Sequence, residues 1–216
     1  MEMRSEPKRI TGKSIISLAI VVCLLLLFMQ PRASLAWQPQ PGDIIFQTSP
    51  SSQSLAIHKA THSLWSHVGI ILLKNNKPMV FEASGDVRYT PLQKWIDHGV
   101  GKSYVAKRLK QPLSTAQVQA LNQQAGYFIG KPYDILFGWS DTDIYCSELV
   151  WKMYFRAAGL KIGTVQRIED FDLSSPAVKK IIKARYGDKL PLNEQVISPV
   201  AMFDSPLLET VASVGY

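Results

Sequence analysis

Three side chains in this sequence, Cys146, His67 and Glu82, are of the types that carry out nucleophilic acyl transfer. A cysteine thiolate attacks a carbonyl carbon when a histidine lies within hydrogen-bond reach, and an acid can orient that histidine. Each residue also has a structural interpretation: a small buried cysteine, a histidine with satisfied hydrogen bonds, and an acid at a strand end. The choice depends on whether the fold brings the three together.

The segment after Cys146 has the spacing of an amphipathic helix. Its apolar residues recur at steps of three and four, which places them on one face. They are Cys146, Leu149, Val150, Met153 and Ala157. Gly159 is a normal helix stop, and Asp141, Thr142 and Asp143 offer capping side chains before the helix. Cys146 is therefore predicted in the first turn, where free backbone N–H groups favour a negatively charged sulfur.

His67 and Glu82 are predicted on the two strands of one hairpin. His67 lies near the start of an apolar strand over residues 66–73, and Glu82 lies near the end of the return strand over 78–83. The turn between them, residues 74–77, contains two asparagines, which tolerate left-handed dihedrals. Counting residues outward from this turn along each strand puts His67 and Glu82 nearly opposite each other. A small offset in strand register would make them cross-strand neighbours. Such a carboxylate would set the tautomer of the imidazole and favour imidazolium.

The remaining histidines give weaker signals. His58 and His62 are four residues apart on a short helix predicted over 52–62, a spacing that can bind a metal ion. No third ligand is evident, so a solvated helix face is the favoured interpretation, and we expect neither a metal nor another cofactor. His98 lies on a predicted surface loop.

The other predicted elements complete an α+β fold. Strands precede the longer helices, an order that favours an antiparallel sheet packed against helices. Further strands are predicted at 43–47, 87–90 and 103–109, and helices at 91–98, from Ser114 with a capping box to Gln117, and at 174–184. Residues 191–216 are predicted to be mostly irregular. The aromatic residues Trp65, Trp95, Phe137 and Trp139 could line a groove, although a core position is the favoured interpretation.

Residues 1–36 have the layout of a secretory signal peptide. A basic start, an apolar run over 15–29 and a small-residue pattern ending at Ala36 predict cleavage before Trp37. The apolar run is short for a transmembrane helix, which needs about 20 residues, so an uncleaved anchor is the weaker alternative. We expect residues 37–216 to form one exported domain, located in the periplasm without stable membrane insertion.

Composition narrows the possible functions of the exported domain. The chain has 216 residues and a net charge of +7, and without residues 1–36 it has 180 residues and a net charge of +4. No dense run of Lys and Arg is interleaved with aromatic residues, so nucleic-acid binding has little support. Cleavage would leave Cys146 as the single cysteine, unable to form an internal disulfide. Such a thiol is either buried and inert or retained for its reactivity.

Several short motifs together indicate a family. In chain order they are Pro-Gly-Asp-Ile-Ile-Phe at 41–46, Ser-His-Val-Gly at 66–69, Phe-Glu-Ala at 81–83, Gly-Lys-Pro-Tyr-Asp at 130–134 and Tyr-Cys-Ser-Glu-Leu-Val at 145–150. With these motifs the chain resembles the permuted papain-fold amidases of the YiiX/YaeF type, relatives of the NlpC/P60 cell-wall hydrolases. In ordinary papain-like enzymes the cysteine helix precedes the histidine strand, whereas here it follows, as circular permutation would produce.

The resemblance implies Cys146 as nucleophile, His67 as base and Glu82 as the orienting acid. It also places Tyr133 and Asp134 near the cleft. We expect a cysteine hydrolase that cleaves an amide in cell-envelope peptides through a thioester.

The backbone N–H of Cys146 would stabilise the oxyanion, with Tyr133 or Tyr145 as a second donor. A lipid acyl hydrolase or acyltransferase using the same site, and a non-catalytic envelope-peptide binding module, remain alternatives. A redox sensor is weakly supported without a second cysteine.

Overall fold

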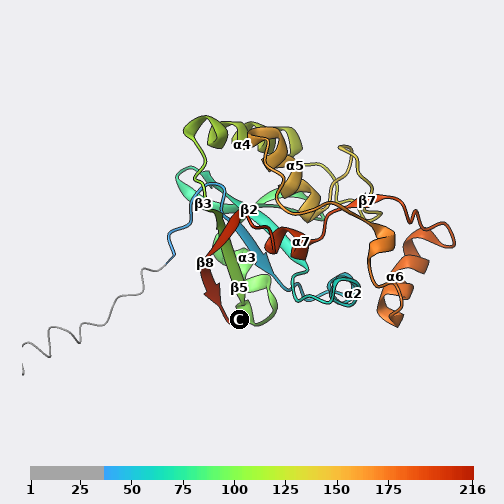
Figure 1. The fold of residues 1–216 in the computed structure, drawn as a ribbon. Coiled ribbons are helices and arrows are strands. Elements are labelled where there is room, and N and C mark those ends of the chain that lie inside the picture. The colour runs from blue at the N-terminus through green and yellow to red at the C-terminus, as the bar shows by residue number, and fades with distance from the viewer. Residues whose placement is uncertain (1–36) are drawn as a thin grey trace, which may run out of the picture. The chain divides into compact units, whose positions relative to one another are not determined.

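The computed structural model describes residues 37–216; the predicted signal peptide, residues 1–36, lies outside the described part. The fold is built on one antiparallel sheet with strand order β4-β3-β2-β1-β5-β8 (Figure 1). Its strands are β1 (Ile44–Gln47), β2 (His67–Lys74), β3 (Lys77–Ser84), β4 (Asp86–Pro91), β5 (Tyr104–Leu109) and β8 (Leu208–Val214). A second, two-stranded sheet pairs β6 (Gln166–Arg167) with β7 (Gln195–Val196). The predicted α+β class is confirmed.

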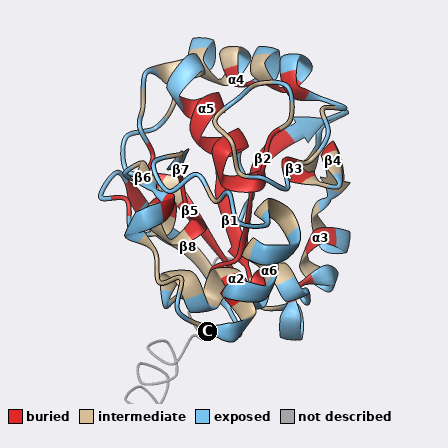
Figure 2. Ribbon diagram, turned by 90° about the vertical axis from the view of Figure 1, so that its right-hand side faces the viewer, coloured by how far each residue is buried: buried red, intermediate tan, exposed pale blue. Residues whose placement is uncertain are grey.

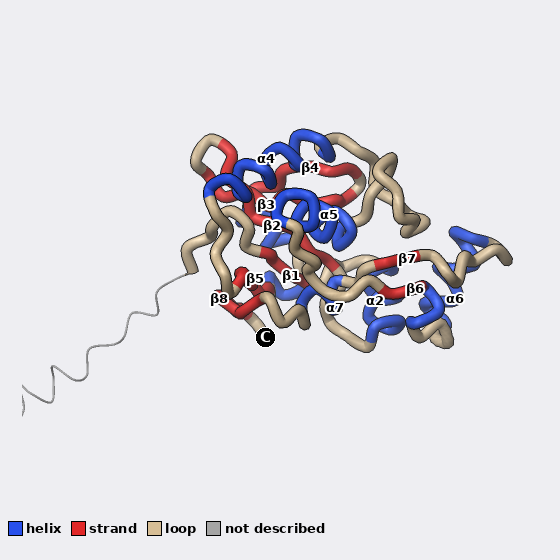
Figure 3. Tube along the Cα trace, turned by 45° about the horizontal axis from the view of Figure 1, so that its top comes forward, coloured by secondary structure: helices blue, strands red, loops and turns tan. Residues whose placement is uncertain are grey.

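Helices cover the sheet and extend beyond it. They are α2 (Ser52–Thr61), α3 (Leu92–His98), α4 (Thr115–Phe128), α5 (Cys146–Ala158), α6 (Pro176–Tyr186) and α7 (Pro199–Phe203), with short 3₁₀ turns at Val100–Lys102 and Ile168–Asp170. Helix α5 packs on β2 and β3, with α4 against it, and α2 packs against α6 beside the small β6–β7 sheet (Figure 3). Among residues 37–216, no helix has the length and apolar character that crossing a bilayer requires.

The core lies between the central strands and α5, where Figure 2 shows continuous burial. Sheet residues that are fully buried include Ile44, Phe46, Val68, Ile70 and Phe81. They face the apolar stripe predicted for the cysteine helix, of which Leu149, Val150 and Met153 are fully buried. The amphipathic pattern in the sequence thus corresponds to the packed face of α5.

The β2–β3 hairpin forms as predicted. Lys74 pairs with Lys77, and the two residues between them, Asn75 and Asn76, have φ values of 53° and 59°. Left-handed dihedrals at both central positions match the twist of a two-residue hairpin, and asparagine tolerates them well. The hairpin fixes the strand register that carries His67 and Glu82.

The start of α5 differs from the prediction in its capping. Cys146 is the first helical residue, and Tyr145 is the N-cap, whose backbone N–H donates to Glu148 Oε2 at 3.4 Å. The helix ends at Gly159, with a φ of 70°, as predicted.

The three candidate caps before α5 lie too far from its first turn. Asp141 instead forms ion pairs along the side of the helix, 3.0 Å from Lys152 Nζ and 2.7 Å from Arg156 Nη2. An N-cap must directly precede the first helical residue, and neither Thr142 nor Asp143 does. The predicted caps are therefore wrong.

The prediction of a mostly irregular C-terminal segment is also wrong. Residues 191–216 contain β7, α7 and β8, and β8 pairs with β5 along its whole length at the edge of the main sheet. Within β8 only Leu208 is buried, because an edge strand has a solvated side. The hydrophobic pattern of β8 is therefore too weak to predict a strand from the sequence. Pairing with β5 determines the structure of this segment.

Candidate active site

The structure brings Cys146, His67 and Glu82 together at the N-terminal end of α5. Cys146 is the first residue of that helix, and its side chain lies close enough to His67 at the start of β2 to raise the pKa of that histidine. On the other side of the ring, His67 Nε2 lies 2.5 Å from Glu82 Oε2 of β3. Because Nε2 faces the carboxylate, Nδ1 is the nitrogen left for the sulfur. The three residues are 3%, 8% and 6% exposed, so water scarcely competes for these contacts.

Glu82 is held by donors from two further elements. Trp95 Nε1 on α3 donates to Oε2 at 2.9 Å, and Thr90 Oγ1 on β4 donates to Oε1 at 2.5 Å. Burial alone would raise the pKa of Glu82, but the hydrogen bond and charge of His67, together with these two donors, lower it overall. The Trp95 ring also stacks on His67, with centroids 5.7 Å apart. Glu82 is thus kept ionised against the imidazole, and both rings are kept in place.

The electrostatics of His67 favour imidazolium. Burial would lower its pKa, but the hydrogen bonds to Cys146 and Glu82 and the negative charges of both partners raise it to about 10. A histidine between a sulfur and a carboxylate therefore retains its second proton at neutral pH. His67 can therefore donate a proton to the group that leaves when the sulfur attacks a carbonyl carbon.

Two tyrosines stand beside the sulfur. Tyr133 Oη accepts a hydrogen bond of 2.7 Å from Gln53 Nε2, and Tyr145 Oη accepts one of 3.0 Å from the backbone N–H of Ile197. Burial raises the pKa of Tyr133 most, followed by the charge at Cys146. Burial also raises the pKa of Tyr145, but there the charge of Glu148 outweighs that of Cys146. Both hydroxyls therefore stay protonated.

Asp134 occupies a different place. Its Oδ1 accepts the backbone N–H of Leu136 at 2.7 Å, and the carboxylate is also hydrogen-bonded by the backbone of Phe137 and Gly138. It does not line the cavity beside Cys146, but it shapes the loop through which Phe137 reaches that cavity. A role of Asp134 in binding substrate stays a prediction.

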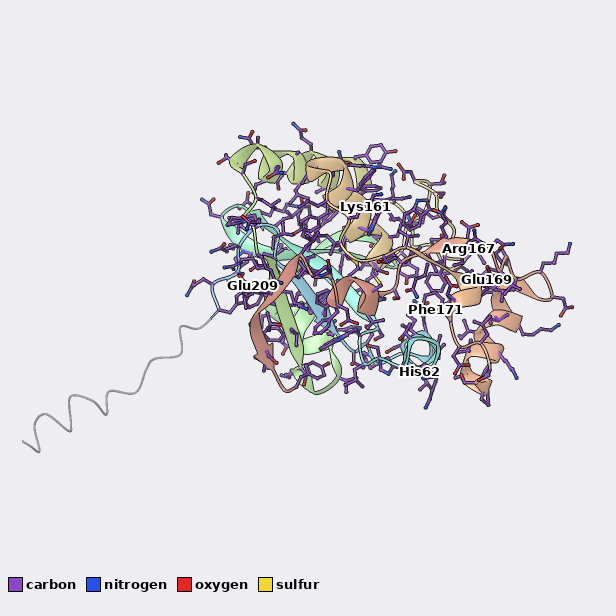
Figure 4. All side chains as sticks on the ribbon, in the orientation of Figure 1. His62, Lys161, Arg167, Glu169, Phe171 and Glu209 are labelled. Carbon is purple, nitrogen blue, oxygen red and sulfur yellow. The ribbon has the colours of Figure 1, made fainter. Side chains whose placement is uncertain are left out.

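The cavity beside Cys146 has an empty volume of about 850 Å³, including its open mouth. Helices α2 and α6 supply much of its wall, through Ala56, Ile57, Val178, Ile181 and Ile182. Phe171, labelled in Figure 4, adds to it from the segment before α6. Among the described residues that line this cavity, none is Asp, Glu, Lys, Arg or His. The thiol therefore opens onto an apolar, uncharged chamber.

This chamber is the feature that sequence reasoning missed. Val178, Ile181 and Ile182 follow the three- and four-residue steps of an apolar helix face, which could have indicated a buried side of α6. Of the aromatic candidates for a groove, Phe137 lines the chamber, whereas Trp65 is buried in the core.

The two histidines of α2 and its C-cap have different contacts, and His58 Nε2 lies 3.5 Å from Ser54 Oγ. His62 Nε2 lies 3.2 Å from Asp172 Oδ2 and the His62 side chain is 74% exposed. Within residues 37–216, no group of three or more His, Cys, Asp or Glu side chains is arranged to hold a metal ion.

Comparisons with known proteins show the family of the chain. The family model described as permuted papain-like amidase enzyme, YaeF/YiiX, C92 family, matches residues 38–212. The chain is 52% identical over 189 residues to the uncharacterized protein YiiX of Escherichia coli K12, covering 88% of this chain and 94% of the relative. It also superposes with a TM-score of 0.80 and 54% identity on the crystal structure of "metalloprotein yiiX" from Escherichia coli O157:H7, covering 82% of this chain and 99% of that one. The chain belongs to the family of permuted papain-like amidases of the YaeF/YiiX type.

Proposed function

We propose that this protein is a thiol-dependent amidase that cleaves the bond between a long apolar acyl group and an amine. Cys146 is the nucleophile, His67 the acid and base, and Glu82 orients His67. The observation that carries the proposal is the position of this triad beside a chamber whose lining is uncharged.

The reaction proceeds through a thioester. The sulfur of Cys146 attacks the carbonyl carbon, and the negative charge moves to the carbonyl oxygen. First-turn N–H groups of α5 have no helical acceptor, so the N–H of Cys146 donates to that oxygen, and the hydroxyl of Tyr133 is the second donor. His67 gives its proton to the amine nitrogen as the carbon–nitrogen bond breaks. His67 then takes a proton from water, which attacks the thioester and releases the carboxylic acid and the thiolate.

The chamber favours an acyl chain over a peptide as the group on the carbonyl side. Each CH₂ that leaves water contributes about 0.8 kcal/mol, and an acyl chain requires no hydrogen-bond partners. A cell-envelope peptide would bring amides and carboxylates, which lose their hydrogen bonds to water and find few partners on this wall. We therefore favour lipid amides of the cell envelope as the substrate class. Export to the periplasm would place the enzyme beside them.

A metal ion has no role in this mechanism. The description of the Escherichia coli O157:H7 relative as a metalloprotein prompts the question. Here Cys146, His67 and Glu82 form a row with the imidazole in the middle, and its Nε2 is committed to Glu82. The three side chains do not converge on a common point, as metal ligands must.

The test is a series of N-acyl amines of increasing chain length, with release of the fatty acid followed by mass spectrometry. We expect kcat/KM to rise by up to about fourfold for each added CH₂ until the chamber is full. Cys146→Ala and His67→Ala should abolish turnover. Rates independent of chain length, with release from peptidoglycan peptides instead, would assign the site to peptides. Tight binding of envelope peptides without any turnover would identify a binding module.

A further inference from the structure

Helix α6 has two sharply different faces. Val178, Ile181 and Ile182 line the chamber, whereas Lys179, Lys180 and Lys183 are exposed on the opposite side. The three lysines fall at steps of one and three residues and share one face. Neither α6 nor its neighbour α2 contains an acidic residue. The wall of the chamber is therefore apolar inside and cationic outside.

Few acidic groups neutralise this face. Asp188 lies 2.7 Å from Lys183 Nζ, but both side chains are largely exposed, so the pair is weak in water. Asp172, on the segment before α6, is paired with His62 of the α2 C-cap, and its charge also acts on Lys179. Lys179 and Lys180 form no ion pair among the described residues. The positive charge of α6 is available to an external partner.

Exposed apolar side chains lie near the C-terminal end of α6. Ile135 is 54% exposed, and its carbonyl oxygen accepts Arg185 Nη1 at 2.9 Å, which ties its loop to the C-terminal part of α6. Leu192, six residues beyond the helix, is 44% exposed. Clustered surface lysines are the chemistry that binds the anionic headgroups of a membrane.

We infer that the outer face of α6 docks on the surface of an anionic phospholipid bilayer. The biological role of this docking rests on the proposed function, because the same helix carries the docking face and the chamber wall. A helix with its side chains is only about 10–12 Å across, so docking holds the chamber within one helix diameter of the lipid. Lysine charge attracts the anionic headgroups.

Lysine footprinting of the full chain tests this docking directly. The protein is treated with an amine-acetylating reagent alone, with phosphatidylcholine vesicles, and with vesicles that also contain phosphatidylglycerol, and each lysine is read by mass spectrometry. We expect acetylation of Lys179, Lys180 and Lys183 to fall about tenfold with the anionic vesicles only, and to recover at about 0.5 M salt, where charges are screened. Exposed lysines on other elements, Lys77 and Lys94, are controls within the same molecule and should not change.

Charge reversal provides a second measurement. The triple variant Lys179→Glu, Lys180→Glu, Lys183→Glu should bind anionic vesicles more weakly than the parent. Each lost lysine should weaken binding about fivefold, so the three together should weaken it on the order of 100-fold. The matched control, Lys77→Glu, Lys94→Glu, Lys110→Glu, carries the same change in net charge and should bind like the parent chain.

Three outcomes would overturn the inference. If neutral vesicles protected the α6 lysines from acetylation as well as anionic vesicles do, the protein would bind bilayers without using the charge of these lysines. Equal protection by soluble polyglutamate would assign the face to acidic polymers, and equal binding of the two triple variants would show that only net charge matters. Protection should persist in Cys146→Ala, so failure of the proposed reaction and failure of the docking are separate results.

Discussion

Replacing Glu82 by glutamine should lower the pKa of His67. In the parent chain that pKa is raised from 6.5 to about 10, which corresponds to about 5 kcal/mol in favour of imidazolium. Glutamine keeps an oxygen for the hydrogen bond but removes the charge. A hydrogen bond to a charged group contributes about 1.5–3 kcal/mol, against about 1 kcal/mol for a neutral one. We therefore expect a loss of about 1.4 kcal/mol, which moves the pKa from about 10 to about 9.

The assay is an NMR titration of the imidazole Cε1 proton between pH 5 and 11, with the His67 signal assigned by its absence from His67→Gln. The control is Glu209→Gln, an exposed carboxylate on β8 labelled in Figure 4, which should leave the midpoint unchanged. Catalysis should follow the same group, so the alkaline limb of kcat/KM should move with it. A midpoint near 6.5 in the parent chain, or equal midpoints in the parent and Glu82→Gln, would refute the reasoning.

Further substitutions test the site, the chamber and the fold. Tyr133→Phe removes the proposed oxyanion donor and should reduce kcat by about 10²–10³, whereas Tyr145→Phe should cost about 1 kcal/mol of stability with kcat nearly unchanged, as steady-state kinetics and denaturant unfolding will measure. Ala56→Phe fills the chamber and should move the preferred acyl chain to shorter lengths in the substrate series. Gly163→Ala places a Cβ 2.6 Å from a backbone carbonyl carbon of α7 at a φ of +84°, and should cost more than about 2 kcal/mol of unfolding free energy. Gly159→Ala, at a φ of +70° with open space around the new Cβ, should cost only about 1 kcal/mol. Because the folded pKa of His67 exceeds its unfolded value, the stability it contributes is complete below about pH 6.5 and is lost as pH rises through about 10; the parent should lose more stability than His67→Gln over that range.

The contacts at the centre of the site were accessible from the sequence because they depend on local rules. Asn75 and Asn76 fix a two-residue turn, the turn fixes the strand register, and the register brings His67 to Glu82. The apolar steps after Cys146 likewise fix which side of α5 is buried. Each of these signals lies within one hairpin or one helix.

The predictions that failed concern features that depend on residues far apart in the sequence. The chamber exists because α2 and α6, more than a hundred residues apart in sequence, pack against each other. Nor could the sequence show that Asp141 would pair with Lys152 instead of capping α5. The edge strand β8 was missed for the same reason, since a strand with little burial of its own depends on its neighbour.

The position of β8 has a consequence for how the chain completes its folding. Among residues 37–216 it is the last strand in chain order, and it covers the outer side of β5. Until it docks, β5 presents a row of unpaired backbone groups that can recruit a strand from another copy. A chain shortened before Leu208 should therefore retain the nucleophile helix and the hairpin and yet aggregate, because this seven-residue strand also protects β5 against self-association.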